Sequence, residues 1–375
     1  MKALLNDPNH KAERVFLVGV ELKAGSPWET ADSMTELAEL ARTAGSNIVG
    51  EGTQKLESIN PATFIGGGKA EEFAKTCREL GVDTVIFDDE LSPAQTRNLE
   101  KVFAGTVMDR TALILDIFAQ RARTREGQLQ VELAQLQYLL PRLSELWVQF
   151  SRLGGASSGG GGGGRIATRG PGETQLEVDR RAIRERIAML KERIEGVSDH
   201  RHRYRERRQQ DGIPVVALVG YTNAGKSTLL HHLSGADILV EDKLFATLDP
   251  TTRRIALPRG QQVLLTDTVG FVSHLPHQLV DAFKSTLEEA AEASLLLHVI
   301  DASDPGFERQ LEVTDKVLAE IDADEVPRLR VFNKIDRVGD AKAQRARAKA
   351  LRAEYPKCIV MSAIDAEDVD KLRKT

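Results

Sequence analysis

The chain has 375 residues, enough for two or three domains of ~150 residues, and its net charge of -5 argues against a uniformly basic nucleic-acid binder. Its two cysteines, Cys77 and Cys358, are too few and too far apart for a disulfide framework or a cysteine-rich metal cluster. Because no apolar run reaches the ~18 residues of a membrane span, we expect a soluble, cytoplasmic protein.

Residues 1–110 alternate short β-rich runs with helical ones, which predicts an N-terminal α/β domain. Helices are expected from Thr30 to Ala44, from Lys69 to Leu80 and from Ser92-Pro93 onward, between the runs VFLVGVEL, NIVGEG, VDTVIFDDE and TVMDR. Ser33 and Glu36 match a capping box for the first helix. Alternating strands and helices predict a parallel sheet covered on both faces.

The segment GGGK at residues 66–69 resembles a phosphate loop at the start of a helix. It lacks the preceding strand and the spacing of a P-loop, so we interpret it as a tight loop-to-helix turn. A second anion site is the alternative.

Residues 111–211 change to a helical period and predict a hairpin of two amphipathic helices with a flexible, glycine-rich tip at about 154–172. Pro141 falls inside the first apolar stripe and predicts a kink there. The apolar positions of the two helices are Leu129, Leu133, Leu136, Leu140, Leu143 and Trp147, then Ile183, Ile187, Leu190, Ile194 and Val197.

Positive charge collects on the second arm of this hairpin, where residues 165–210 carry thirteen Lys and Arg against eight Asp and Glu. A solvated helix face with internal ion pairs is one interpretation. The basic surplus, together with Arg121, Arg123 and Arg125 on the other arm, favours contact with RNA phosphates.

Residues 212–375 predict a doubly wound nucleotide-binding domain, because the apolar run IPVVALV leads into GYTNAGKS at residues 220–227. This P-loop pattern lets backbone N–H groups surround a β-phosphate, while Lys226 neutralises the β and γ oxygens and the Ser227 hydroxyl binds Mg²⁺. The loop alone does not distinguish ATP from GTP.

The run NKID at residues 333–336 favours guanine. The Asp336 carboxylate could accept hydrogen bonds from the adjacent N1–H and N2 amine of guanine, a donor pair that adenine lacks, and Asn333 would support it. Ser362 and Ala363 follow a later strand, and we expect the Ala363 N–H to reach the guanine oxygen.

DTVG at residues 267–270 and FATLDPTT at residues 245–252 have the order of the two switch segments of a GTPase. We expect Asp267 in the second shell of the magnesium ion and the Gly270 N–H at the γ-phosphate. Thr247 is our choice for the second magnesium hydroxyl, with Thr251 and Thr252 as open alternatives.

These motifs, with FATLD, DTVGF and the upstream GPGETQLEVDRR, resemble the HflX family of ribosome-associated GTPases over nearly the whole chain. The resemblance implies an N-terminal α/β domain, a helical hairpin whose loop enters the large ribosomal subunit near the peptidyl transferase centre, and a GTPase domain. It also implies that the whole protein splits or rescues stalled ribosomes under stress. Many relatives carry a C-terminal extension, whereas here twelve residues follow Ala363, so we expect a GTPase domain that is short at its C-terminus, by truncation or naturally.

The predicted partners are therefore GTP and GDP, and the large ribosomal subunit with its rRNA; we expect a monomer with Mg²⁺ as cofactor. The predicted catalytic residues are Lys226, Thr247 and Gly270, and the predicted magnesium ligands are Ser227 and Thr247. The predicted nucleotide contacts are Gly220, Tyr221, Thr222, Asn223, Ala224, Gly225, Lys226, Ser227, Phe245, Ala246, Thr247, Leu248, Asp249, Asp267, Thr268, Val269, Gly270, Asn333, Lys334, Ile335, Asp336, Ser362 and Ala363.

Phe271 stands where Ras-like enzymes carry the glutamine that orients the attacking water. This predicts hydrolysis that is slow alone and stimulated by a ribosomal particle. It also leaves open a GTP-stabilised RNA-binding module in which hydrolysis is incidental. Asn223 resembles the asparagine of GTPases that use K⁺, so a K⁺ cofactor is a second hypothesis, against the alternative that Asn223 only satisfies loop backbone groups.

Overall fold

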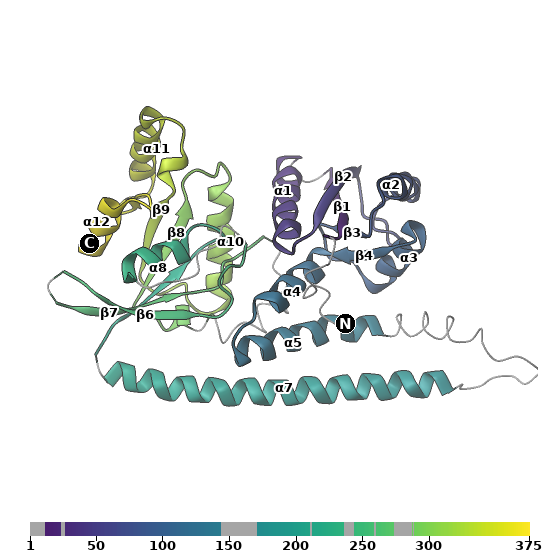
Figure 1. Cartoon of the computed structure of the whole chain (residues 1–375), viewed down its shortest axis with the longest axis horizontal. Helices are drawn as coiled ribbons and strands as arrows, with labels where there is room; N and C mark the ends of the chain where they lie inside the picture. The colour runs from purple at the N-terminus through teal and green to yellow at the C-terminus, as the bar shows by residue number, and fades with distance from the viewer. Residues whose placement is uncertain are drawn as a thin grey trace, which may run out of the picture. The chain divides into compact units, whose positions relative to one another are not determined.

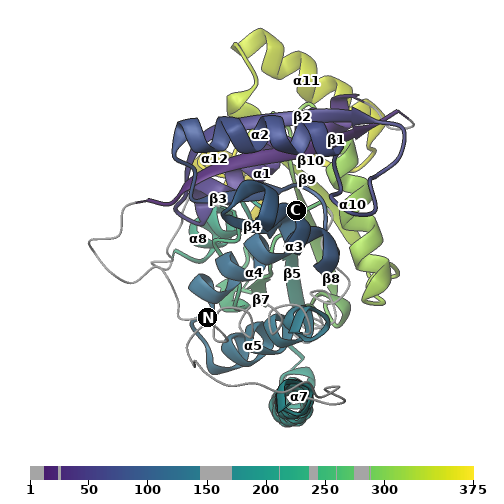
Figure 2. The same cartoon turned by 90° about the vertical axis from the view of Figure 1, so that its right-hand side faces the viewer.

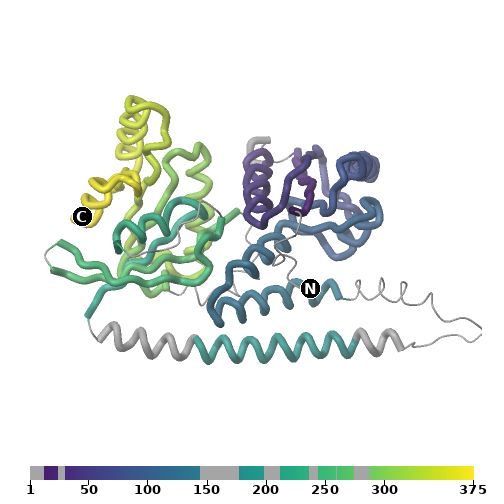
Figure 3. Tube along the Cα trace, viewed as in Figure 1, coloured from purple at the N-terminus to yellow at the C-terminus, as the bar shows by residue number. Residues whose placement is uncertain are grey.

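The structure is a computed structural model that describes residues 12–23, 27–143, 171–210, 212–235, 244–258, 260–273, 287 and 289–375. For residues 27–29, 171–176 and 198–210 it describes the backbone alone. Contacts group the chain into two units (Figure 1). The first contains Met1–Ile117 and Glu132–Glu192, and the second contains Phe118–Val131 and Arg193–Thr375. The path of the chain through each unit can be followed in Figure 3.

The first unit is built on a parallel sheet, as predicted, and its four strands have the order β2-β1-β3-β4. Val15, Phe16, Leu17 and Val18 of β1 are all buried, so both faces of the sheet are covered, by α1 on one side and by α2 and α3 on the other. The elements are β1 (Arg14–Leu22), α1 (Pro27–Thr43), β2 (Asn47–Leu56), α2 (Gly67–Leu80), β3 (Thr84–Phe87), α3 (Pro93–Phe103) and β4 (Thr106–Asp109).

The predicted capping box of α1 is wrong, because the helix begins at Pro27 and Ser33 and Glu36 lie in its interior. Both side chains face the buried guanidinium of Arg110, which donates to Ser33 Oγ at 3.2 Å and pairs with Glu36. Arg110 also pairs with Asp88 at 2.7 Å. The Ser33 and Glu36 side chains therefore bind Arg110, which is distant in sequence, and not the backbone N–H groups at a helix terminus.

The middle of the chain is helical, as predicted. It contains α4 (Arg110–Arg121), α5 (Arg125–Leu139), the 3₁₀ turn η1 (Leu140–Arg142) and α7 (Pro171–Gln210). The α-helix ends at Leu139 and Pro141 lies in the 3₁₀ turn, which agrees with the predicted break. Within the first unit α5 lies beside α7 (Figures 1 and 2), and Arg186 forms a bidentate ion pair with Glu132 at 2.7 and 2.9 Å. Trp147 and residues 154–170 of the predicted tip lie outside the described residues.

The second unit contains a six-stranded sheet with order β10-β9-β8-β5-β7-β6. All neighbouring pairs are parallel except β6 with β7, so the sheet is mixed. The carboxyl ends of its parallel strands meet at one edge, where ligands bind in such folds. The elements are β5 (Val215–Val219), α8 (Lys226–Ser234), β6 (Thr251–Ala256), β7 (Gln262–Asp267), β8 (Leu295–Asp301), α10 (Phe307–Glu320), β9 (Arg328–Asn333), η2 (Ile335–Arg337), α11 (Ala341–Glu354), β10 (Ile359–Val360) and α12 (Ala366–Lys374).

Across the described ranges, no helix combines the length and the apolar character that a membrane crossing requires.

Candidate nucleotide-binding site

The loop between β5 and α8 is a tight turn that requires glycine at two positions. Gly220 has a φ of 140°, and a Cβ there would lie 2.2 Å from the Val299 carbonyl oxygen. Gly225 has a φ of 99°, and its Cβ would lie 2.3 Å from Nδ2 of Asn333. Side chains at either position would be strained and would clash. The close approach brings the amino end of α8, with its free N–H groups, to the edge of the sheet.

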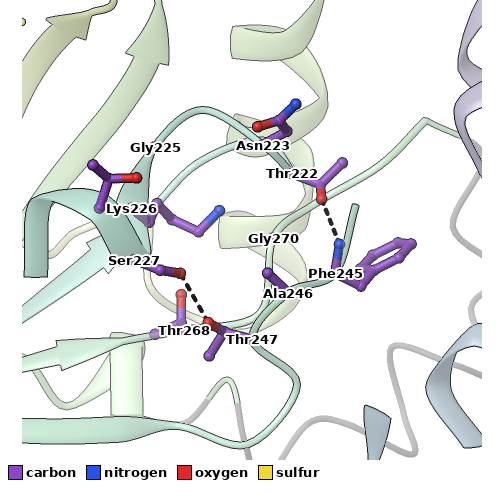
Figure 4. A pocket seen from close by; sticks show the side chains of 11 residues that line it. Thr222, Asn223, Gly225, Lys226, Ser227, Phe245, Ala246, Thr247, Thr268 and Gly270 are labelled. Atoms are coloured by element: carbon purple, nitrogen blue, oxygen red, sulfur yellow. Dashed lines mark hydrogen bonds between the residues drawn. The ribbon is translucent and has the colours of Figure 1, made fainter. Parts of the chain in front are cut away.

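Lys226 is the first residue of α8, and its side chain runs along the inside of this loop (Figure 4). Its Nζ donates to the carbonyl oxygens of Gly220 at 3.1 Å and Tyr221 at 2.8 Å. Burial lowers the pKa of Lys226 to about 8, while the nearby Asp267 opposes the shift. A bound phosphate would favour the charged ammonium in the same way.

Ser227, Thr247 and Asp267 bring three side-chain oxygens together beside this lysine. Ser227 Oγ lies 2.8 Å from Thr247 Oγ1 (Figure 4). Both hydroxyls also donate to Asp267 Oδ2, at 2.6 and 2.8 Å. Thr252, one of the alternatives to Thr247, instead pairs with Thr266 between β6 and β7 at 2.9 Å. The structure therefore brings Thr247, of the three candidate threonines, into the hydroxyl cluster.

The oxygen cluster fits a magnesium ion. Asp267 is 1% exposed, and among the described residues its Oδ1 has no hydrogen-bond partner. Burial raises the pKa of Asp267, with Lys226 and the two hydroxyls opposing. A divalent cation at the cluster would stabilise the carboxylate, and hydroxyl and carboxylate oxygens are ligands that Mg²⁺ accepts. No group of three His, Cys, Asp or Glu within the described ranges could hold a metal, so such a site depends on hydroxyls and phosphates.

The DTVG segment is tied to the P-loop by its backbone. Phe271 N donates to the Gly220 carbonyl at 3.2 Å, and Thr222 N donates to the Phe271 carbonyl at 2.7 Å. A Cβ at Gly270 would lie 2.6 Å from Thr222 Cα and 3.0 Å from Lys226 Nζ, so this position also requires glycine. The Phe271 ring is 1% exposed and packs in the apolar core with Val219.

Asn333 connects three loops at the ends of the parallel strands. Its Nδ2 donates to the Ala224 carbonyl at 2.9 Å, and its Oδ1 accepts from Ala363 N at 2.8 Å. Asp336 lies in η2 with an exposed side chain, and no described residue forms a hydrogen bond or an ion pair with its carboxylate. This arrangement leaves a free carboxylate beside a fixed amide.

Comparisons with known proteins identify the family of this site. Successive parts of the chain match three family models: GTP-binding GTPase N-terminal over residues 31–119, GTP-binding GTPase Middle Region over residues 121–208, and 50S ribosome-binding GTPase over residues 215–334. The chain is 55% identical over 324 residues to GTPase HflX of Caldanaerobacter subterraneus subsp. tengcongensis, covering 86% of this chain and 73% of that protein. The chain belongs to the HflX family of GTPases.

A second HflX protein and a solved structure are also similar over most of this chain. GTPase HflX of Escherichia coli is 49% identical over 309 residues, covering 82% of this chain and 70% of that protein. The crystal structure of SsGBP with GDP aligns over 96% of both chains with a TM-score of 0.52 and 25% sequence identity. The predicted family and the predicted GTPase activity are thereby confirmed.

Ten of the 23 predicted nucleotide contacts of this HflX GTPase line one pocket at the end of the P-loop (Figure 4). Thr228 is an additional member that the sequence analysis missed, although its place after the GKS motif and inside the first turn of α8 was a signal. The lining residues are Thr222, Asn223, Gly225, Lys226, Ser227, Thr228, Phe245, Ala246, Thr247, Thr268 and Gly270.

Thirteen predicted nucleotide contacts of this HflX GTPase lie outside the pocket lining, and Tyr221, Leu248, Asp249 and Val269 are among them. The Tyr221 hydroxyl lies 2.7 Å from Ser273 Oγ, and Leu248 and Val269 are buried. The Asp249 carboxylate accepts from the backbone N–H groups of Arg123 and Thr124. These four side chains therefore bind or pack against other parts of the protein and stabilise the loops that form the site.

The Ala363 N–H donates to Asn333 Oδ1 at 2.8 Å in this structure, and its contact with guanine stays a prediction. In this structure the amide side chain satisfies the donor that was expected to face guanine. Lys334 has a left-handed backbone with a φ of 59°, and its Nζ pairs with Asp301 Oδ2 at 2.8 Å.

Proposed function

We propose that this HflX GTPase binds the large ribosomal subunit in its GTP-bound state and leaves it after hydrolysis. The observation that carries the proposal is the cluster of Ser227, Thr247 and Asp267, which joins the P-loop to both switch segments. The matching model for residues 215–334, described as a 50S ribosome-binding GTPase, supports the choice of partner.

In the proposed site, Lys226 neutralises the β- and γ-phosphate oxygens, and the Gly270 N–H binds the γ-phosphate. Ser227 and Thr247 would hold the magnesium ion, with Asp267 behind them. When bound, the ion neutralises negative charge that develops on the phosphates. Loss of the γ-phosphate would free Thr247 and Gly270, which releases the two switch segments.

Guanine recognition is assigned to Asp336, supported by Asn333. The exposed carboxylate of Asp336 is available for two adjacent donors, whereas the amide of Asn333 is already used to connect the P-loop with the loop at Ala363. Desolvation of an unpaired carboxylate by a base without those donors would be costly, which favours GTP over ATP.

The buried ring of Phe271 supports slow intrinsic hydrolysis, since no side chain at that position reaches the pocket to orient water. A ribosomal particle could supply the missing group and raise the rate by roughly 10³- to 10⁵-fold. The same observation favours a second candidate function, a GTP-stabilised RNA-binding module in which hydrolysis is incidental.

The basic surplus of residues 165–210 supports rRNA as the contact, through α7 and the segment that precedes it. Splitting or rescue of stalled ribosomes under stress is the cellular role that the family resemblance favours. Release of the subunit on hydrolysis is the step that such a role requires.

The test is GTP turnover with and without purified 50S subunits, in matched KCl and NaCl buffers, for the full chain and for a variant that lacks residues 154–164. We expect strong stimulation that falls when the glycine-rich segment is removed. No stimulation of the full chain would favour the binding-module function. Equal rates in KCl and NaCl would exclude a K⁺ role at Asn223.

A further inference from the structure

The FATLD loop (residues 245–249) is attached to the helical segment 118–131, which belongs to the same contact unit. At its first residue, the Phe245 ring stacks edge-to-face on Phe118, with centroids 4.7 Å apart and planes at 87°. Phe245 N also donates to Thr222 Oγ1 of the P-loop at 2.9 Å. Phe245 is 1% exposed and has a φ of 53°, so the surrounding contacts hold a backbone conformation that is unfavourable for its residue type.

The last residue of the loop, Asp249, is attached to the start of α5. Its Oδ2 accepts from Arg123 N at 3.0 Å and Thr124 N at 2.9 Å, and its Oδ1 accepts from the Thr124 hydroxyl. Thr124 in turn caps α5 by accepting from Gly127 N at 3.0 Å. A carboxylate is favoured at this end of a helix by the free N–H groups and the helix dipole.

Gly127 makes this attachment possible. A Cβ on Gly127 would lie 2.4 Å from Asp249 Oδ1, closer than atoms approach without displacement. The helix interior otherwise disfavours glycine, so its presence in the first turn of α5 matches the need for space beside the carboxylate.

Thr247 lies between the two attached residues, Phe245 and Asp249. Two residues of chain span at most ~7 Å, so fixing both neighbours restricts where the Thr247 hydroxyl can lie. We propose that Asp249 is a positioning residue that holds Thr247 against Ser227 and Asp267 by binding the start of α5. This proposal rests on the proposed function, in which Thr247 responds to the γ-phosphate.

The coupling is reciprocal, because a contact that stabilises the GTP-bound loop is itself stabilised by GTP. A displacement of the first turn of α5 would therefore weaken the binding of GTP, and bound GTP would favour the capped start of α5. GDP, which lacks the γ-phosphate, would be affected much less.

The test uses Gly127→Ala, a change outside the nucleotide pocket that puts a methyl group where Asp249 lies. The matched control is Gly68→Ala in α2, where an added Cβ meets no atom within 4 Å. Dissociation constants are measured for a non-hydrolysable GTP analogue and for GDP, together with single-turnover hydrolysis at saturating GTP. We expect roughly fivefold weaker binding of the analogue for Gly127→Ala, from loss of a helix-terminal hydrogen bond, with GDP changed less than twofold and the control unchanged.

Asp249→Ala is the second variant, and it removes the same contact from the other side. Because both changes break one contact, their effects on analogue binding in the double variant should be less than additive. Asp249→Asn, which keeps one acceptor oxygen, should restore part of the affinity. Equal weakening of GDP and analogue binding in both single variants would show a structural role only and would overturn the proposal.

Thr247→Ala separates this proposal from the proposed function. If Thr247→Ala lowers the preference for the GTP analogue over GDP while Gly127→Ala and Asp249→Ala do not, the positioning role of Asp249 is wrong and the proposed function stands. If Thr247→Ala leaves that preference unchanged, the proposed function of Thr247 fails, and the positioning role fails with it.

Discussion

At the scale of single residues, Asp336 gives the sharpest test of nucleotide choice. Asp336→Asn replaces one acceptor oxygen with an amide donor, so the pair of hydrogen bonds to guanine is lost. We expect GTP to bind roughly 10- to 150-fold more weakly, the usual worth of a hydrogen bond to a charged group. Xanthosine triphosphate, which has a carbonyl at C2, should gain affinity because that oxygen accepts from the amide. Competition binding of the two nucleotides measures the change, and equal loss for both would contradict the role of Asp336.

His298 gives a prediction about pH. It is 1% exposed in β8, and burial, with Arg328, Arg330 and Lys226 adding to the effect, lowers its pKa to about 3 from 6.5. Below pH 6.5 the unfolded chain therefore binds a proton that the native protein does not. The free energy of unfolding should fall as the pH drops from 6.5 toward 3, by at most ~1.4 kcal/mol per pH unit from this group.

His298→Leu should flatten that dependence, measured by guanidinium unfolding of the nucleotide-free protein between pH 6.5 and 5. His232→Leu, on the exposed side of α8, controls for removing a histidine. An unchanged slope in His298→Leu would contradict the prediction.

The residues of the pocket were predictable from sequence where their chemistry is local. The glycines, Lys226 and Ser227 follow from the P-loop spacing, and Thr247 from the order of the motifs. The contact of Asp249 with the start of α5 was not predictable, because an acid two residues after a threonine in a loop fits a nucleotide contact equally well. Its actual partners, Arg123 and Thr124, are separated from it by more than one hundred residues of sequence.

At the scale of elements, Arg110 joins three segments of the first unit. It is the first residue of α4 and is 2% exposed. Its guanidinium pairs with Glu36 of α1 and with Asp88, which follows β3. Arg110→Met would leave two carboxylates largely buried without their cation, which costs ~3–5 kcal/mol. Urea unfolding measures the loss.

Lys69→Met provides the comparison for Arg110→Met, since it removes the surface pair with Glu72 and should cost at most ~1 kcal/mol. Equal losses in the two variants would mean that the buried pairs contribute no more than a surface pair.

The same cluster explains why helix ends were harder to predict than helices. Both Ser33–Glu36 and Ser92–Gln95 match the capping-box pattern, and only the second is a capping box in the structure. The local sequence shows the capping-box pattern, but it does not show that a residue distant in sequence, here Arg110, binds the same side chains. The antiparallel pairing of β6 with β7 was not predicted, although the short connection from Ala256 to Gln262 leaves no room for the crossover that parallel strands require.

At the scale of the whole molecule, the basic surplus of the middle region predicts a salt dependence. Replacing Arg201, Arg203 and Arg205 with glutamine should weaken binding of 50S subunits and reduce the slope of log K against log salt by roughly two to three, since each phosphate contact releases about one counterion. The matched control replaces three exposed basic residues of α11, Lys342, Arg345 and Lys349. Equal slopes for the two triple variants would exclude the arginines of residues 201–205 from the phosphate contacts.

The contact units have a practical consequence for dissecting the molecule. A fragment that begins at Gly212 would keep every GTPase motif, yet it would lose Phe118 and Thr124, the partners of Phe245 and Asp249. The aromatic ring would meet solvent, and the carboxylate would have only water to bind. The compact unit that contains the GTP site is therefore discontinuous in sequence, and we expect a fragment that begins at Gly212 to differ from the full chain in its preference for GTP over GDP even where it folds.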